Sequence, residues 1–110
     1  MDFFAEIKAF DRKMRRHPLP TAAQLLWYKL MTVANGLFWP EWFTVDNDRL
    51  AELINGSKKT AIAARSELID GGFLLFERGV KRQPSRYKLL SIAEMEQPHQ
   101  EAPEDAGAPP

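Results

Sequence analysis

The segment from residue 46 to residue 72 restricts the fold more than any other part of this 110-residue chain. Asp46 or Asn47 can cap a short helix, because either side chain can accept hydrogen bonds from the first free backbone amides. Asn55-Gly56 breaks that helix, Ser57 caps a second one, and Gly71-Gly72 ends it. The positions expected to be buried are Leu50, Ala51, Leu53, Ile54, Ala61, Ile62, Leu68 and Ile69. The pattern predicts two helices joined by a tight turn, a helix-turn-helix.

The second of these helices carries small, polar and basic residues on its outward side. Steps of 100° per residue place Lys59, Ala63, Ser66 and Asp70 on one line facing away from the core. Ser57, Lys58, Lys59 and Thr60 form the helix start, where free backbone amides and cationic side chains suit contact with phosphates and base edges. Arg65 falls toward the apolar side instead. We expect its stem to cover the core edge and its head to reach an acid or a phosphate.

A hairpin-like segment follows the second helix directly. Phe73–Glu77 and Arg86–Leu90 have the residue types of strands, and Arg78–Ser85 between them is turn-forming and basic. Its cations are Arg78, Lys81 and Arg82, with Arg86 at the start of the second strand, and Gly79 permits a turn. We therefore predict a mainly α fold with a small β-hairpin, a winged helix-turn-helix with an extra N-terminal helix. In this arrangement the helix at 57–70 enters the major groove of double-stranded DNA and the wing at 78–86 lies on the backbone.

Two further helices are expected before this motif. Phe3, Ile7, Phe10 and Met14 form one apolar stripe of a helix from Asp2 to Arg16, with Glu6, Lys8, Arg12 and Lys13 on its charged face. The stripe is typical of core packing, and self-association through it stays open. The next helix begins at Thr21, where Gln24 completes a capping-box pattern, and Asn35-Gly36 ends it.

Four aromatic side chains gather around Pro40. They are Phe38, Trp39, Trp42 and Phe43, and the last of them begins a strand-like Phe43-Thr44-Val45. Such density can form a base-stacking platform or a ligand pocket. In a domain of this size we expect the rings to pack in the core instead.

The formal net charge is zero, but the charges are unevenly distributed. Residues 57–90 hold eight basic and three acidic side chains, whereas residues 91–110 hold five acidic ones and no basic ones. The basic excess coincides with the predicted helix-turn-helix and wing. It favours a polyanionic partner, double-stranded DNA, for that part of the chain.

The end of the sequence differs in composition from the rest. From Ile92 onward it is rich in Pro, Glu, Gln and Ala and has little apolar surface to bury, so we expect it to be disordered. We therefore predict a winged-helix domain at 1–91 and an acidic tail at 92–110. The tail is interpreted as a linker, as an acidic arm over the basic face, or as a solubilising segment.

The sequence offers little for catalysis, metal binding or membrane insertion. It has no cysteine, and its two histidines are His17, beside a helix end, and His99, in the tail. We expect no catalytic residue, no metal site and no cofactor, and hence a protein that is not an enzyme. No apolar run approaches the roughly 18 residues that a membrane helix needs. A cytoplasmic location without membrane association is predicted.

The chain also resembles a known family, the N-terminal winged-helix domain of DnaD-like proteins and of phage or mobile-element replisome organisers. The resemblance covers about residues 3–90 and is carried by HPLPTAAQLLWYKLMTVAN, WPEWFTV, RLAELINGSKKTAIAARSELIDGGFL and RYKLL. It implies DNA binding, self-association and a role with other replication proteins in assembling initiation complexes. The helical C-terminal module of that family has no counterpart here. We carry over only Ser57, Lys58, Lys59, Thr60 and the basic wing and hairpin residues.

Two other functions remain open for the same fold, because fold alone does not fix function. One is transcriptional regulation, and the other is a winged helix that only makes protein contacts in an assembly.

Overall fold

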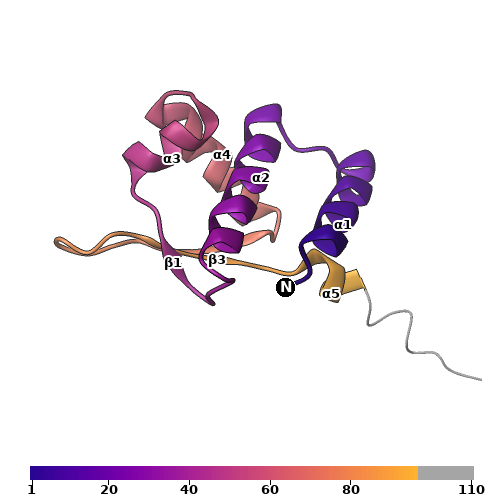
Figure 1. The fold of residues 1–110 in the computed structure, drawn as a ribbon. Coiled ribbons are helices and arrows are strands. Elements are labelled where there is room, and N and C mark those ends of the chain that lie inside the picture. Colours follow the sequence, from indigo (N-terminus) through magenta and orange to yellow (C-terminus); the bar gives the residue numbers. More distant parts are fainter. Residues whose placement is uncertain (97–110) are drawn as a thin grey trace, which may run out of the picture. The chain divides into compact units, whose positions relative to one another are not determined.

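The computed structural model describes residues 1–96, which form two compact units. One unit combines Met1–Pro18 with the described residues from Ser91, and the other spans Leu19–Leu90. Figure 1 shows their helices and strands, most of them labelled. Each unit is described by itself below.

The larger unit has the element order of a winged helix-turn-helix. Its helices are α2 (Thr21–Gly36), α3 (Asn47–Ile54) and α4 (Lys58–Asp70), and its strands are β1 (Phe43–Thr44), β2 (Leu74–Glu77) and β3 (Arg86–Leu89). The strands form an antiparallel sheet in the order β1-β3-β2, in which Tyr87 pairs with both Phe43 and Phe76. The predicted fold class is confirmed. The pairing of β1 with the hairpin, which makes the sheet three-stranded, was not predicted.

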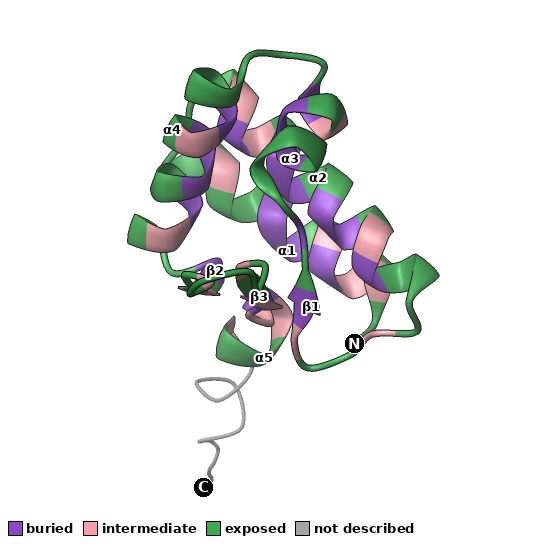
Figure 2. Cartoon of the chain, turned by 90° about the vertical axis from the view of Figure 1, so that its left-hand side faces the viewer, coloured by how far each residue is buried: buried purple, intermediate pink, exposed green. Residues whose placement is uncertain are grey.

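The core of this unit comes from one side of each helix and from alternate strand residues. Figure 2 shows buried and exposed positions alternating along α2, α3 and α4. Leu26, Trp27, Leu30, Leu50, Leu68, Leu74 and Tyr87 are among its largest fully buried side chains. Burial of these apolar side chains supplies most of the drive for folding. The opposite faces of these helices are exposed to solvent.

The ends of the helix-turn-helix follow the local sequence closely. Asp46 caps α3 by accepting a 2.7 Å hydrogen bond from the Arg49 amide, and Asn55 ends it in the left-handed conformation at φ 53°. Ser57 caps α4 by accepting a 3.1 Å hydrogen bond from the Thr60 amide, and Gly72 follows that helix at φ 82°. These short-range hydrogen bonds and backbone preferences confirm the predicted tight turn.

The two ends of α2 lie at the predicted residues, Thr21 and Gly36, but neither is capped in the predicted way. Pro20 occupies the N-cap position without a side-chain bond, and the Gln24 amide donates 2.7 Å to the Leu19 carbonyl, so there is no capping box. Gly36 is the last helical residue, and the left-handed conformation falls on Phe38 and Trp39, at φ 63° and 59°. The amides of Phe38 and Trp39 donate to the carbonyls of Asn35 and Ala34, at 3.1 and 2.9 Å. The helix therefore ends at Asn35-Gly36 as predicted, but the left-handed residues that follow it are Phe38 and Trp39 rather than Gly36.

The aromatic cluster is therefore only partly a core feature. Phe43 is buried, Trp39 and Trp42 are half-buried, and Phe38 is 91% exposed. The prediction of core packing is wrong for Phe38. The backbone that closes α2 directs this residue outward, whatever its hydrophobicity. A left-handed conformation costs a bulky residue about 1–3 kcal/mol, so Phe38 is both strained and solvated.

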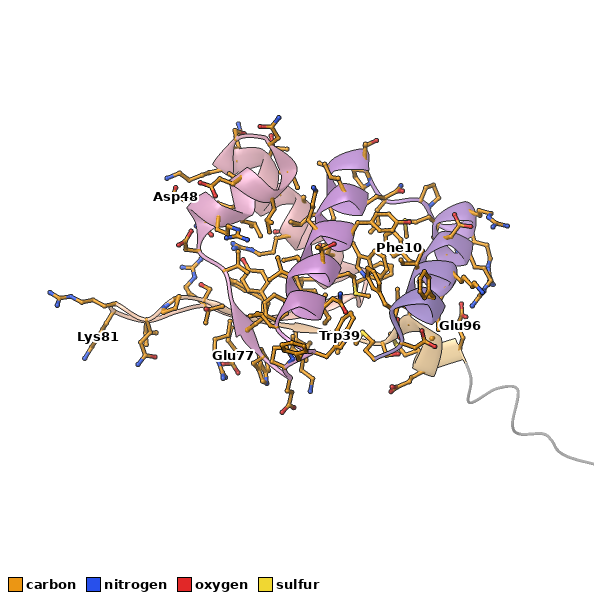
Figure 3. All side chains as sticks on the ribbon, viewed as in Figure 1. Phe10, Trp39, Asp48, Glu77, Lys81 and Glu96 are labelled. Carbon is orange, nitrogen blue, oxygen red and sulfur yellow. The ribbon has the colours of Figure 1, made fainter. Side chains whose placement is uncertain are left out.

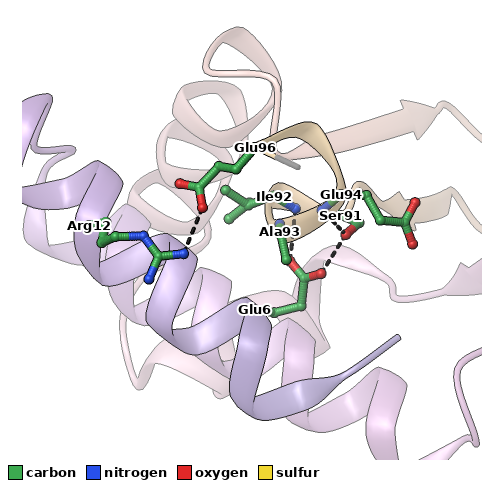
Figure 4. Close-up of polar contacts among 7 residues, drawn as sticks. All are labelled: Glu6, Arg12, Ser91, Ile92, Ala93, Glu94 and Glu96. Atoms are coloured by element: carbon green, nitrogen blue, oxygen red, sulfur yellow. Dashed lines mark hydrogen bonds and ion pairs between the residues drawn. The ribbon is translucent and has the colours of Figure 1, made fainter. Parts of the chain in front are cut away.

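The smaller unit contains α1 (Phe3–Arg16) and α5 (Ile92–Glu96). Glu6, expected on the charged outer face of α1, is 2% exposed. Its carboxylate accepts a 2.8 Å hydrogen bond from the Ile92 amide and another from the Ser91 hydroxyl (Figure 4). Glu6 lies three residues after Phe3 and four before Phe10, so helical spacing places it beside the apolar stripe.

The expected disorder from Ile92 onward is corrected for residues 92–96. Ile92 is buried, Ser91 accepts a 3.0 Å hydrogen bond from the Glu94 amide, and Glu96 pairs with Arg12 at 2.6 Å (Figure 4). Burial of one isoleucine and satisfaction of the first amides stabilise this short helix despite its polar composition. The rest of the predicted tail, residues 97–110, lies outside the described residues.

Candidate nucleic-acid interface

All ten predicted contact residues are exposed in the larger unit. Six lie at the start or on the outer side of α4, and four lie on the β2–β3 wing or its base. The α4 set is Ser57, Lys58, Lys59, Thr60, Ala63 and Ser66, and the wing set is Arg78, Lys81, Arg82 and Arg86. Exposure makes each of them accessible to a ligand. They differ in whether they already form a hydrogen bond or an ion pair within the chain.

The first turn of α4 contains one cation with an acidic partner and one without. Lys58 Nζ lies 2.9 Å from Asp48 Oδ1 of α3, and this hydrogen bond and charge raise the pKa of Lys58 above its ordinary value. Lys59 has no acidic partner among residues 1–96. The hydroxyls of Ser57 and Thr60 bond to each other at 3.0 Å while Ser57 caps the helix. Lys59 is therefore the cation of this turn that is most available.

A shallow groove of about 330 Å³ lies beside Lys59. It is lined by small side chains of α2 and α4, chiefly Ala22, Ala23, Ala63 and Ala64. Ala63 was expected to face outward, and it does. The short side chains leave the backbone of α4 open to close approach by a large ligand. Glu67 is the one acidic residue that lines the groove.

The turn of the wing depends on a glycine. A Cβ atom on Gly79 would lie 1.9 Å from the Gln83 carbonyl oxygen, so no other residue fits without moving the backbone. The Gly79 amide donates to the Ser85 hydroxyl at 3.0 Å, and the Gln83 amide donates to the Val80 carbonyl at 3.0 Å. Lys81 takes a left-handed φ of 57° at the tip. Figure 3 shows the Lys81 side chain at the outer end of the hairpin.

Three of the four wing cations are available, and one is engaged. Arg78, Lys81 and Arg82 have no acidic partner in the part of the chain that the structure describes. Arg86 pairs with Glu77 across the hairpin, and its guanidinium lies 4.7 Å from the centre of the Trp42 ring. Trp42 was missed as a neighbour of the wing, because nothing in the local sequence predicts which strand β1 pairs with.

Arg65 connects α4 with α3 and the sheet. Its side chain is 8% exposed, and Nη1 donates to Asn47 Oδ1 at 3.0 Å and to the Tyr87 hydroxyl at 3.1 Å. The guanidinium also lies 4.2 Å from the centre of the Phe76 ring. The stem covers the core edge as predicted. Of the two partners expected for the head, an acid or a phosphate, the acid is wrong within this unit, since both observed acceptors are neutral. Burial raises the pKa of Tyr87, an effect that the Arg65 hydrogen bond opposes.

These contacts of Arg65 hold the base of the wing against α4. Asn47 begins α3, Tyr87 lies in β3 and Phe76 lies in β2, so one side chain touches three neighbouring elements. A side chain fixed by a cation–π contact and two hydrogen bonds has little freedom to rearrange. The helix and the wing are thus held in a fixed relation within this unit.

Residues 1–96 show neither a cluster of metal-ligating side chains nor a helix suited to a membrane. No group of three or more His, Cys, Asp or Glu side chains is positioned to hold a metal ion. None of the described helices has the length and apolar character needed to cross a membrane.

Comparison with known proteins identifies structural likenesses only. No family model and no curated protein matches the sequence. A solved structure described as a Rep–DNA complex has a TM-score of 0.61 at 17% identity, covering 86% of this chain and 84% of that chain. A second, the N-terminal domain of a DNA binding protein, has a TM-score of 0.55 at 17% identity, covering 76% and 75%. The chain is similar to both in fold, in agreement with the winged helix-turn-helix described above.

Proposed function

We propose that this chain binds double-stranded DNA, with α4 in the major groove and the wing on the phosphate backbone, and that it catalyses no reaction. One observation carries the proposal: Lys59, Arg78, Lys81 and Arg82 are exposed on two elements of the same unit, with no acidic partner among the described residues. Cations without internal partners can neutralise phosphates and release counterions. The four side chains supply the electrostatic part of binding, and the small outer residues of α4 permit close approach.

The proposed biological role is replication initiation. Two considerations support it: the sequence resemblance to DnaD-like and replisome organiser domains, and the fold likeness to a protein in a Rep–DNA complex. In this role other replication proteins are the proposed partners. Lys58 and Arg86 are proposed to contact DNA only where phosphate displaces their acidic partners. These partners are Asp48 for Lys58 and Glu77 for Arg86.

The experiment is fluorescence anisotropy of the full chain with labelled duplex DNA over a range of salt concentrations. We expect the double variant Lys59→Ala/Arg82→Ala to weaken binding and to reduce the slope of log K against log salt by about 2, because each neutralised phosphate contributes about 0.9. Lys8→Ala/Arg16→Ala removes two exposed cations from α1 and serves as the matched control. Equal loss of affinity in both variants would assign binding to net charge rather than to α4 and the wing.

The same titration separates this proposal from the two other functions. A sequence-specific transcriptional regulator would show a strong preference for a pair of palindromic half-sites over unrelated duplexes. An assembly module that only contacts proteins would show no salt-sensitive DNA affinity, even at low salt. Salt-sensitive binding that is lost in the double variant supports the proposed interface.

A further inference from the structure

Phe38 is the most exposed large apolar side chain among the described residues. It is 91% exposed, and its neighbour Leu37 is 52% exposed. Its left-handed φ of 63° belongs to the position after a helix end where glycine is the usual residue. The closure of α2 sets the backbone conformation at Phe38 but does not require a phenylalanine there, since a glycine would adopt this φ more easily. A feature that folding does not need points to a contact with another molecule.

An open groove begins at the same helix end. Its volume is about 580 Å³, and its lining comes from the second half of α2, from β1 and the residue after it, and from α3. The apolar lining residues are Val33, Leu37, Val45 and Leu53, and the basic ones are Lys29 and Arg49. Leu37 therefore lines the groove, and it directly precedes Phe38 in the sequence. The protruding ring and the groove belong to one continuous surface.

We propose that this surface binds a second copy of the chain, with Phe38 of each copy seated in the groove of the other. A surface that carries both a protrusion and a hollow is self-complementary under a two-fold axis, the commonest symmetry of protein dimers. Each ring would leave water on contact with apolar lining residues.

The charges beside the two features are complementary as well. Glu41 lies three residues after Phe38, and its side chain is 70% exposed although it pairs with Lys88 at 2.9 Å. Lys29 and Arg49 of the groove are exposed, and neither has an acidic partner among residues 1–96. A loop that presents Phe38 and Glu41 therefore meets a groove with an apolar lining and basic residues. Cations close to a seated phenylalanine ring also add favourable cation–π contact.

The proposed contact leaves the DNA interface free. No residue of α4 or of the wing lines this groove, whereas Lys59 and Thr60 line the separate groove between α2 and α4. Two joined copies can therefore each present α4 and a wing. A contact centred on one ring and one short loop from each copy is small, so we expect a weak dimer that forms at high concentration and is favoured when two copies bind one duplex.

The test is sedimentation equilibrium of the full chain without DNA, over a wide concentration range. We expect reversible dimerisation that Phe38→Gly weakens by about tenfold or more, as removal of a central aromatic contact does at other interfaces. The glycine variant suits the left-handed position, so it should unfold at a higher temperature than the parent while associating less. Phe4→Ala, which removes a 73% exposed phenylalanine from α1, is the matched control.

A complementation experiment tests the paired geometry. Thr32→Trp places a large side chain in the groove but keeps Phe38, whereas Phe38→Gly keeps the groove. Each variant alone should associate at least tenfold more weakly than the parent. Their mixture should associate more strongly than either variant alone, because one ring and one open groove remain in the mixed dimer. The proposal is overturned if the parent chain stays monomeric at millimolar concentration, if Phe38→Gly dimerises like the parent, or if only Phe4→Ala abolishes association. It is also overturned if the mixture associates no more strongly than either variant alone. The outcome is independent of DNA binding, which is measured separately on single-site duplexes.

Discussion

Arg65 of α4 donates a hydrogen bond of 3.1 Å from Nη1 to the hydroxyl of Tyr87 in β3. The guanidinium is buried and has no carboxylate partner in the described part of the chain. It also contacts Asn47 Oδ1 and the Phe76 ring. A buried cation that depends on neutral oxygens and a ring is sensitive to the loss of any one of them. It is the main polar connection between α4 and the base of the wing.

Replacement of Arg65 by methionine should lower the free energy of unfolding by about 1–3 kcal/mol. Methionine keeps much of the apolar stem, so the loss comes mainly from the buried Tyr87 hydroxyl and Asn47 amide, which lose a donor. Tyr87→Phe alone leaves the guanidinium with one acceptor fewer and should cost a similar amount. In a double-mutant cycle by urea denaturation, we expect the two substitutions to couple by about 1 kcal/mol or more. Additive effects would show that the hydrogen bond contributes nothing to stability.

Stability should fall at alkaline pH because of Tyr87. Burial raises the pKa of this phenol above its ordinary value of 10.0, so the folded chain holds the proton more firmly than the unfolded chain does. The contribution is fully present below pH 10 and is lost as the pH rises through the higher folded-state pKa. Urea denaturation between pH 8 and pH 11 should show this decline in the parent chain. Tyr87→Phe should remove it, whereas Tyr28→Phe, which alters an exposed tyrosine of α2, should retain it.

Removal of the Asp48 charge should strengthen DNA binding if the proposed interface is correct. Asp48→Asn releases Lys58 from its 2.9 Å ion pair and removes a negative charge beside the first turn of α4. We expect a higher affinity and a slope of log K against log salt that is steeper by about 1, the effect of one additional phosphate contact. Anisotropy titrations measure both quantities. Asp11→Asn, which breaks an exposed ion pair with Arg15 on α1, should leave them unchanged.

Loss of the Glu6 carboxylate should open α5. Glu6→Ala removes the acceptor for the Ile92 amide and the Ser91 hydroxyl, so the Ile92 amide should exchange with solvent at least tenfold faster. Hydrogen exchange followed by NMR measures this directly. Glu6→Gln retains one carbonyl acceptor and should have a smaller effect. Equal exchange rates in Glu6→Ala and the parent would mean that the cap does not stabilise α5.

The elements that could be predicted from sequence are those fixed by residues close together in the chain. Ser57 caps α4 and Asp46 caps α3, because each side chain bonds to an amide three residues ahead. The placements of Glu6 and Phe38 were mispredicted. Glu6 bonds to residues 85 and 86 positions away, and Phe38 faces solvent because the left-handed conformation that follows α2 falls on it and on Trp39 rather than on Gly36. Apolar character alone does not decide burial when the backbone conformation directs a side chain outward.

The sequence by itself determined the helix-turn-helix, the basic wing and the outward position of the predicted contact residues, because helical period, capping and turn preferences act over a few residues. Only the tertiary structure decided which cations remain available. Lys58 forms an ion pair with Asp48, and Arg86 forms one with Glu77. The cations that have no acidic partner among residues 1–96 are Lys59, Arg78, Lys81 and Arg82. The physical reason is that these contacts require close approach in space. Examples are the ion pair of Lys58 with Asp48, the contact of Arg86 with the Trp42 ring and the buried hydrogen bond from Arg65 to Tyr87. That approach is set by the packing of elements and not by their spacing in the chain.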